Sequence, residues 1–327
     1  MSKLVTVFGG SGFVGRYIVQ RLAHEGWRVR VACRRPNEAG FLRTYGTVGQ
    51  VEPVFCNIRD DDSVRGVTHG ADAVVNCVGT FDVGGKNSFD AIHVEGAGRI
   101  ARIASEEAVE RMVHISALGA DAEGPSKYAQ SKAAGEEAVL DSMPGAMILR
   151  PSVIFGAEDG FFNRFAGLSK LGPILPLFGG KTLFQPVFVD DVAAAAAKGV
   201  TGEAPGAIYE LGGPHEGTLT EFVKDMLEVI HRRRIVVNNP FFLGAILGSV
   251  LDVLSAISLG LFTNNVLTRD QVRQLKVDNV VSGELPGFEE LGIEPVSAET
   301  VMPDYLWPHR PSGQYAAIKD SARNLKI

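Results

Sequence analysis

Tyr128 and Lys132, in the segment SKYAQSK, stand four residues apart, the spacing that places two side chains on one face of a helix. On such a face the lysine can hydrogen-bond a nicotinamide ribose, and its charge is expected to lower the tyrosine pKa toward the range of a general acid or base. Ser116 ends an apolar run of strand type, where its hydroxyl can polarise a substrate carbonyl. Such a pair is common by composition alone, so its meaning depends on the surrounding fold.

The elements that must position these residues are alternating strands and helices. Before Arg150, short apolar runs alternate with segments of helical period. Continuous hydrophobicity is typical of strands covered on both faces, as in a parallel sheet. We therefore predict an α/β fold with a doubly wound parallel (Rossmann) sheet. The predicted strands are LVTVF, RVRVAC, VEPVF, ADAVVNC, RMVHIS and AMILR, and the predicted helices cover residues 14–25, 89–108 and 127–140.

This rhythm loosens after Arg150, which divides the chain into two predicted domains. Residues 1–150 form the Rossmann domain, and residues 151–327 form a smaller, mainly helical domain with a partner-binding tail. Two sheet-like segments within residues 183–213, FQPVFV and AIYELGG, are expected to extend the Rossmann domain.

A glycine-rich loop follows the first predicted strand and opens the first helix, in the segment VFGGSGFVGRYIV. Gly9, Gly12 and Gly15 allow a tight turn, close approach of bare backbone to a pyrophosphate and close helix packing, with the helix N-terminus facing the phosphates. The alternative is a turn that binds no nucleotide. The strand and helix around the loop favour a dinucleotide site that also includes Phe13 and Val14.

The second strand ends in VACRRP, where an NAD-binding protein would carry a carboxylate for the ribose 2′-hydroxyl. Arg34 and Arg35 stand there instead, and guanidinium groups bind a 2′-phosphate through charge-assisted hydrogen bonds. We therefore predict NADPH as the cofactor, with Arg16 as a further cation. The alternative is that both arginines are solvated loop charges. The other predicted cofactor residues are Asn57 and Ile58 after the third strand, Gly79 after the fourth, Ser116, Tyr128 and Lys132, and Pro151 and Ile154 in RPSVIFG.

Composition excludes some classes of function. The net charge of −6 and the absence of a Lys/Arg stripe argue against nucleic-acid binding. Cys33, Cys56 and Cys77 lack metal-ligand spacing and are expected to be reduced core residues, and we predict no metal ligands. The chain enters a strand pattern at its N-terminus, so we expect a bacterial cytoplasmic protein, although a processed organellar chain would look the same.

Two later features suggest a partner. Residues 241–262 are almost entirely apolar and could form either a buried helix or a surface that meets a membrane or membrane protein; the central Asp252 argues against a transmembrane span. The HRRR cluster at 231–234 could complement a helix C-terminus or bind anionic lipid headgroups. The tail from Pro303 is rich in proline and aromatic residues, so we expect no regular structure there, only a strap over its own domain or an arm on a partner.

The chain resembles a known family at several motifs. FGGSGFVG, HISALG, YAQSK and RPSVIFG resemble an extended, atypical short-chain dehydrogenase/reductase, whose triad would map onto Ser116, Tyr128 and Lys132. The segments RPSVIFGAEDGFFNRFA, QPVFVDDVA, LTRDQVRQLKVDNVV and LPGFEELGI extend the resemblance to the nucleotide-binding accessory subunits of respiratory complex I. Such reductases often carry Asn at the start of an NVxGT motif, whereas this chain has His93 in HVEGAG, which argues against an ordinary substrate site.

This resemblance implies an accessory, structural subunit of NADH:quinone oxidoreductase that holds a tightly bound NADPH and supports assembly and stability rather than electron transfer. Its partners would be complex I subunits of the hydrophilic arm near the membrane junction, together with lipid headgroups. It would be peripheral, on the cytoplasmic face of a bacterial inner membrane or the mitochondrial matrix side, with no assigned catalytic residue. The alternatives are a stand-alone NADP-dependent reductase or epimerase that uses the Ser/Tyr/Lys triad, and a free NADPH-responsive regulator.

Overall fold

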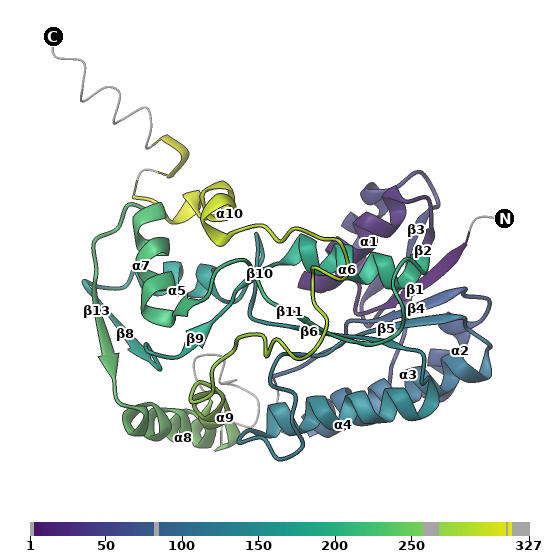
Figure 1. The fold of residues 1–327 in the computed structure, drawn as a ribbon, viewed down its shortest axis with the longest axis horizontal. Helices are drawn as coiled ribbons and strands as arrows, with labels where there is room; N and C mark the ends of the chain where they lie inside the picture. The colour runs from purple at the N-terminus through teal and green to yellow at the C-terminus, as the bar shows by residue number, and fades with distance from the viewer. Residues whose placement is uncertain (1–2, 82–84, 258–267, 312, 316–327) are drawn as a thin grey trace, which may run out of the picture. The chain divides into compact units, whose positions relative to one another are not determined.

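The computed structural model describes residues 3–81, 85–257, 268–311 and 313–315, and the chain falls into two compact units (Figure 1). The first unit comprises Met1–Ser152, Val189–Gly212 and Val281–Pro295. The second comprises Val153–Phe188, Gly213–Val280 and Val296–Ile327. The chain therefore leaves the first unit after Ser152 and returns to it twice. Of the two segments expected to extend the Rossmann domain, AIYELGG supplies a strand of the first unit, whereas the strands of FQPVFV belong to the second.

A seven-stranded parallel sheet forms the centre of the first unit, as predicted from the continuous apolar runs. Every neighbouring pair in the sheet is parallel, so helical crossovers must cover both of its faces. In spatial order the strands are β11 (Ile208–Leu211), β6 (Met147–Pro151), β5 (Arg111–Ile115), β4 (Ala73–Asn76), β1 (Leu4–Phe8), β2 (Arg28–Cys33) and β3 (Val51–Phe55).

Helices lie on both faces of this sheet (Figure 1). The helices on one face are α1 (Phe13–His24) and α6 (Val189–Thr201), and those on the other are α2 (Asp61–Thr68), α3 (Glu95–Glu106) and α4 (Lys127–Ser142). Two short elements complete the unit: η1 (Pro36–Tyr45) follows β2, and the π-helical turn η3 (Asp90–Val94) leads into α3. The N-terminus of α4 is fixed by the Ser126 side chain, which accepts a hydrogen bond from the Ala129 amide at 3.0 Å.

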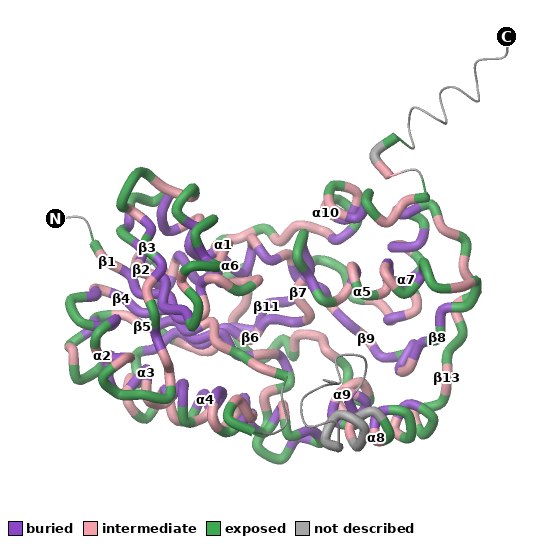
Figure 2. The backbone as a smooth tube through the Cα atoms, turned by 180° about the vertical axis from the view of Figure 1, so that it is seen from behind, coloured by how far each residue is buried: buried purple, intermediate pink, exposed green. Residues whose placement is uncertain are grey.

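The core of the first unit lies between the sheet and its helices, where the tube in Figure 2 is coloured as buried. Phe8, Ile100 and Val139 are fully buried in it, and each such side chain contributes about 1.5–3 kcal/mol through burial. Cys33 and Cys56 are buried free thiols, as expected of core residues, and the free Cys77 is half-buried.

The strand order places a crevice beside the first strand. From β1 the chain moves outward through β2 and β3, then crosses back to β4 on the opposite side of β1. In doubly wound sheets, ligands bind at the carboxyl ends of the strands where the order reverses in this way. The loops that follow β1 and β4 are therefore the elements on which a binding site is expected.

The second unit combines small sheets with helices. Its core contains Phe155, Phe162 and Met226, all fully buried. Thr218 and Glu221 form a capping box at the start of α7. The strands are β7 (Ile154–Phe155), β8 (Ile174–Phe178), β9 (Leu183–Phe184), β10 (Val187–Phe188), β12 (Gly217–Thr218) and β13 (Ile235–Asn239), and the helices are α5 (Phe162–Leu168), α7 (Leu219–Val229), α8 (Phe241–Ile257), α9 (Arg269–Gln274) and α10 (Ala298–Tyr305).

The aromatic C-terminal segment has regular structure, so the prediction of none was wrong. Helix α10 continues through Pro303, and a 3₁₀ turn covers Trp307–His309. The Tyr305 hydroxyl donates a hydrogen bond to Asp159 Oδ2 at 2.7 Å, and Arg310 Nε donates one to the carbonyl of Val229 at 2.9 Å. This segment is therefore a strap over its own unit.

The apolar segment 241–262 forms α8 as far as Ile257, and its last five residues lie outside the described part. Gly244 and Gly248 are buried. They pack closely on their neighbours, since an added Cβ would lie 2.8 Å from the ring of Phe178 at Gly244 and 2.9 Å from the backbone nitrogen of Arg269 at Gly248. Of the two alternatives for this segment, burial does not hold for its large apolar side chains, because these are exposed: Phe242, Leu243, Ile246, Leu247 and Val250. Among the residues described, no helix has both the length and the hydropathy of a membrane span.

The HRRR cluster is partly used within the second unit. His231 follows α7 with a positive φ of 54°. Arg232 Nε donates to the carbonyl of His309 at 2.8 Å, and Arg234 Nε donates to that of Ser169 at 2.7 Å. Two of the three guanidinium groups therefore hold backbone of their own unit, and both keep their positive charge.

Candidate functional site

The glycine loop forms a tight turn between β1 and α1. Gly9 has φ of +74°, and its carbonyl accepts the Gly12 amide at 2.9 Å. A Cβ at Gly15 would lie 2.4 Å from the Gly9 oxygen, so only glycine allows the helix to pack this closely. Phe13 and Val14 are the first two residues of α1, where amide groups lack helical partners. The amide groups at this helix N-terminus suit a phosphate.

The loop after β4 meets the glycine loop at the crevice. A Cβ on Gly9 would lie 3.2 Å from the carbonyl carbon and oxygen of Cys77, so the two backbones are in close contact. Gly79 follows two residues later and is exposed. Bare backbone from both loops is therefore available to a ligand at the place where the strand order reverses.

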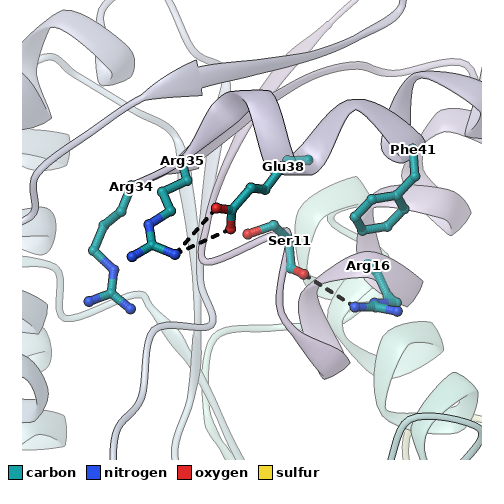
Figure 3. Close-up of a pocket in the computed structure, with 7 residues that line it drawn as sticks. Ser11, Arg16, Arg34, Arg35, Glu38 and Phe41 are labelled. Carbon is teal, nitrogen blue, oxygen red and sulfur yellow. Dashed lines mark hydrogen bonds and ion pairs between the residues drawn. The ribbon is translucent and has the colours of Figure 1, made fainter. Parts of the chain in front are cut away.

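A pocket of about 520 Å³ lies beside the glycine loop and brings the three predicted arginines together (Figure 3). Arg34 and Arg35 are exposed after β2, and Arg16 reaches the pocket from α1. Arg34 makes no ion pair with any residue that the structure describes, whereas Arg35 Nη1 lies 3.3 Å from Glu38 Oε1. Three guanidinium groups against one carboxylate form a donor set that fits a phosphate. The remaining lining residues, which the sequence did not identify, are Ser11, Glu38, Ala39 and Phe41.

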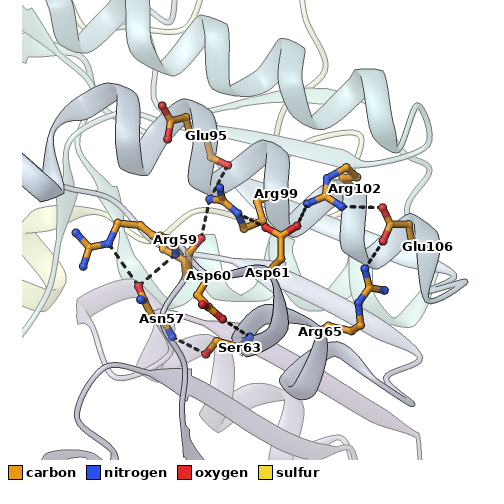
Figure 4. A network of polar contacts seen from close by, with 11 residues as sticks. Asn57, Arg59, Asp60, Asp61, Ser63, Arg65, Glu95, Arg99, Arg102 and Glu106 are labelled. Atoms are coloured by element: carbon orange, nitrogen blue, oxygen red, sulfur yellow. Dashed lines mark hydrogen bonds and ion pairs between the residues drawn. The ribbon is translucent and has the colours of Figure 1, made fainter.

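Asn57 lies in the loop after β3 (Figure 4), and Ile58 follows it in the chain. Asn57 Oδ1 accepts hydrogen bonds from the backbone N–H of Arg59 at 3.3 Å and from Arg59 Nε at 3.4 Å. The backbone N–H of Asn57 donates to Ser63 Oγ at 2.9 Å. The Ile58 side chain is half-buried against the core. The Asn57 carboxamide oxygen thus shapes its own loop, and the predicted contact with adenine stays a prediction.

Tyr128 and Lys132 lie on α4, with the lysine Nζ 5.9 Å from the tyrosine ring centroid. Lys132 is buried, and its Nζ donates to the carbonyl of Ile115 at 3.2 Å. Burial lowers the pKa of Lys132 to about 8, although Glu136 opposes the shift. Burial also raises the pKa of Tyr128 to about 12. The prediction that the lysine lowers the tyrosine pKa was therefore wrong, because loss of hydration dominates.

The Ser116 hydroxyl is hydrogen-bonded to a buried ion pair. Its hydroxyl donates to Glu136 Oε1, and the same carboxylate accepts Arg150 Nη2 at 2.6 Å on Oε2 and Arg150 Nε at 2.9 Å on Oε1. A serine hydroxyl has one proton to donate, so Ser116 does not polarise a carbonyl while it makes this bond. Glu136 was not among the predicted site residues, although its position one turn after Lys132 places it on the same helix face.

His93 connects the β4 loop to α4. It is 2% exposed, and burial, aided by the charge of Lys132, lowers its pKa to about 3. Its Nε2 accepts the Thr80 amide at 3.0 Å, so the neutral ring carries its proton on Nδ1 and donates it to Ser131 Oγ at 2.9 Å. Ser131 Oγ in turn donates to the carbonyl of Tyr128 at 2.8 Å. A directed chain of hydrogen bonds thus ties the loop after β4 to helix α4.

Aromatic rings enclose Tyr128. The ring of Phe81 is stacked on it with centroids 5.5 Å apart, and the rings of Phe89 and His93 meet it edge-on at 5.9 and 5.7 Å. This cluster was not predicted from the sequence. It limits access to the tyrosine ring on several sides.

The last two predicted cofactor residues lie in different units. Pro151 ends β6 in the first unit, and its carbonyl accepts the Leu118 amide at 2.9 Å. Ile154 lies in β7 of the second unit, where it pairs with Val187. Within the described ranges, no three His, Cys, Asp or Glu side chains are grouped as a metal site.

Comparison with known proteins adds independent information. Residues 5–212 match the model of the NAD dependent epimerase/dehydratase family. The alpha subcomplex subunit 9 of mitochondrial NADH dehydrogenase (ubiquinone) from Arabidopsis thaliana is 35% identical over 316 residues, which cover 95% of this chain and 79% of that protein. The Mus musculus protein of the same name is 33% identical over 94% of this chain and 80% of its own length.

Solved structures show the same fold at low sequence identity. The dTDP-glucose 4,6-dehydratase of Bacillus anthracis, solved in complex with NAD, superimposes with a TM-score of 0.69 at 15% identity, over 96% of this chain and 98% of that one. At such identity the likeness concerns the fold alone. It is a fold that binds a dinucleotide at the crevice described above.

Proposed function

This chain belongs to the NAD dependent epimerase/dehydratase family and, within it, to the family of alpha subcomplex subunit 9 of mitochondrial NADH dehydrogenase, and we propose that it is an accessory subunit of a respiratory NADH:quinone oxidoreductase. In this role it holds NADPH and supports assembly and stability rather than electron transfer. It is peripheral, on the cytoplasmic face of a bacterial inner membrane or on the matrix side of an organellar one.

The choice of NADPH rests on the arginine pocket. Arg16, Arg34 and Arg35 line it, and the end of β2 carries no carboxylate to bind a ribose 2′-hydroxyl. A 2′-phosphate would bind to the guanidinium groups by charge-assisted hydrogen bonds, with the pyrophosphate at the N-terminus of α1. Lys132, on α4, would hold the ribose of the nicotinamide. When bound, the nucleotide would supply hydride chemistry, which the proposed role does not use.

The observation that carries a structural role is the engagement of Ser116. Its only proton is donated to Glu136, whose carboxylate is 4% exposed and paired with Arg150. Releasing that proton toward a substrate would leave the buried carboxylate with one hydrogen bond fewer, at a cost of about 1–3 kcal/mol. Tyr128, with its pKa raised to about 12, is also poorly matched to proton transfer near neutral pH.

A bound nucleotide benefits such a subunit without any turnover. A ligand that binds only the folded state adds RT ln(1 + [L]/Kd), which is about 4 kcal/mol at a thousandfold excess over Kd. The glycine loop and the arginine pocket all belong to the first unit, so this free energy stabilises that unit directly.

Two substitutions in the native host test the role. Arg34→Ala should release NADPH and reduce the amount of the chain in the membrane complex, because a phosphate-binding cation is lost. Tyr128→Phe should leave NADH:quinone oxidoreductase activity at the wild-type level. Arg43→Ala is the matched control, since Arg43 is an exposed arginine of η1 that lines no part of the pocket. Loss of activity in Tyr128→Phe with the complex fully assembled would contradict the structural role.

One observation favours the second candidate, an NADP-dependent reductase or epimerase. Tyr128 and Lys132 retain the one-turn spacing on α4, and burial lowers the lysine pKa to about 8. An enzyme of this kind would be recovered as a soluble monomer or dimer. Native electrophoresis of solubilised membranes separates the two proposals, since the accessory subunit migrates with a large assembly.

The partner surface that we propose is the exposed face of α8. Its apolar side chains are 42–62% exposed, a concentration that marks an interaction site. Because α8 itself carries no Lys or Arg that could pair with anionic headgroups, we assign this face to a protein partner rather than to lipid headgroups. That partner is a complex I subunit of the hydrophilic arm near the membrane junction.

A charge on α8 tests this surface. Ile246→Asp should reduce co-migration with the large assembly without unfolding the protein, because Ile246 is 59% exposed. Val48→Asp, at a fully exposed position of the first unit, is the matched control. If the purified wild-type chain instead binds phosphatidylglycerol vesicles and Ile246→Asp abolishes that binding, the face meets lipid and the assignment to protein is wrong.

A further inference from the structure

Phe41 is a large aromatic residue left at the surface of the arginine pocket. It is 40% exposed, whereas its neighbours Ala39 and Leu42 are 1% and 0% exposed and anchor η1 to the first unit. The ring is therefore partly open to the pocket and is presented from a fixed element. Tyr45, one turn later, meets it edge-on with centroids 6.2 Å apart, which restrains the ring further.

The ring of Phe41 faces a cation. The guanidinium carbon of Arg16 lies over it, 5.0 Å from the centroid, well inside the range of a cation–π contact (Figure 3). The same guanidinium donates to backbone carbonyls of the glycine loop, through Nε to Gly12 at 3.3 Å and through Nη2 to Ser11 at 3.4 Å. Arg16 is thus held between the first turn of α1 and an aromatic ring of η1.

We propose that Phe41 is a specificity-determining residue that positions Arg16 for the 2′-phosphate of NADPH, and this rests on the cofactor proposed above. Arginine loses side-chain freedom when it binds a phosphate, so an arginine fixed beforehand binds more tightly. The contact of Phe41 with Arg16 supplies that preorganisation. Its effect is confined to nucleotides that carry the 2′-phosphate.

Glu38 makes this positioning necessary. It lines the same pocket and lies 3.3 Å from Arg35, so part of the positive charge is already engaged by a carboxylate. Arg16 approaches from α1, and the ring of Phe41 packs on its guanidinium. A neutral aromatic ring holds the cation without adding a negative charge to the pocket, as a second carboxylate would.

The test measures the dissociation constants of NADPH and NADH for the full-length protein by isothermal titration calorimetry. Phe41→Leu should weaken NADPH binding about two- to fivefold, the size of an exposed cation–π contact, and leave NADH binding unchanged. Arg16→Gln should weaken NADPH binding more strongly. In the Arg16→Gln background, Phe41→Leu should have no further effect on NADPH, because the cation it positions is gone.

Controls separate this inference from the proposed cofactor. Phe55→Leu removes another exposed phenylalanine of the first unit that lines no part of the pocket, and it should keep the wild-type ratio of the two affinities. If the wild type binds NADPH and NADH equally, the proposed cofactor is wrong and the inference fails with it. If the wild type prefers NADPH but Phe41→Leu weakens both nucleotides equally, the ring stacks on a shared part of the ligand. That result, or independent effects in the double variant, would overturn only the positioning role.

Discussion

Acidification should destabilise the first unit through His93. Burial, together with the charge of Lys132, lowers the pKa of this histidine from 6.5 to about 3, so the folded protein keeps the ring neutral while the unfolded chain binds a proton. A histidine with a depressed folded-state pKa contributes stability above its unfolded pKa and loses it as the pH falls. The window of loss therefore runs from about pH 6.5 down to about pH 3.

The magnitude follows from proton linkage. Between about pH 7.5 and about pH 5, one such histidine removes about 2 kcal/mol from the free energy of unfolding. This value is set by the unfolded-state pKa, because pH 5 is still well above the folded-state value. Protonation would also turn Nε2 into a donor facing the Thr80 amide, which is a donor itself.

Urea unfolding of the wild type and of His93→Asn at both pH values measures this contribution. The variant is expected to be less stable at neutral pH, but its stability should fall by about 2 kcal/mol less on acidification. His114 is equally buried and its pKa is also lowered to about 3, so it contributes to both proteins and cancels in the comparison. His215→Asn, at an exposed position of the second unit, is the control for loss of a histidine. Equal losses in the wild type and His93→Asn would refute the reasoning.

Three other substitutions test the site. Arg150→Ala leaves the Glu136 carboxylate buried without its cation and should lower the free energy of unfolding by about 3 kcal/mol in urea titrations. A loss below about 1 kcal/mol would show that Arg150 and Glu136 behave as a surface ion pair. Gly15→Ala should abolish NADPH binding, because its Cβ would lie 2.4 Å from a backbone oxygen. Gly40→Ala, which has open space around it, should bind NADPH as the wild type does. Equal NADPH binding by the two variants would refute the close packing of the loop. Glu38→Gln removes the one carboxylate among the described residues that line the pocket, and it should tighten NADPH binding relative to NADH binding in calorimetric titrations. An unchanged ratio of the two affinities would mean that Glu38 does not oppose the phosphate.

Local sequence patterns were sufficient to predict an element of the structure where a single physical requirement determines its residue types. Strands buried on both faces need continuous apolar runs, so the doubly wound parallel sheet could be predicted from the sequence. The glycine loop could be predicted because close backbone packing admits no side chain at Gly15. The family resemblance from the same motifs agrees with the match to residues 5–212 and with the mitochondrial relatives.

Patterns failed where a residue's environment comes from distant parts of the chain. The spacing of Tyr128 and Lys132 predicted a lowered tyrosine pKa, but spacing cannot report hydration, and burial raises that pKa instead. The hydrophobicity of 241–262 left a buried helix and an interaction surface both open, because hydrophobicity alone does not say what covers a surface. Large apolar side chains of α8 are left exposed by the fold.

The sequence by itself determined the sheet, the glycine-rich loop and the three arginines, because each of these follows from residue types at short spacing. Only the tertiary structure decided what Ser116 does, because its partner Glu136 and that residue's partner Arg150 are 20 and 14 residues away along the chain. It also brought Phe41 over Arg16. A hydroxyl, a carboxylate or a ring acquires its role from the groups that packing places around it, and those contacts leave no local pattern in the sequence.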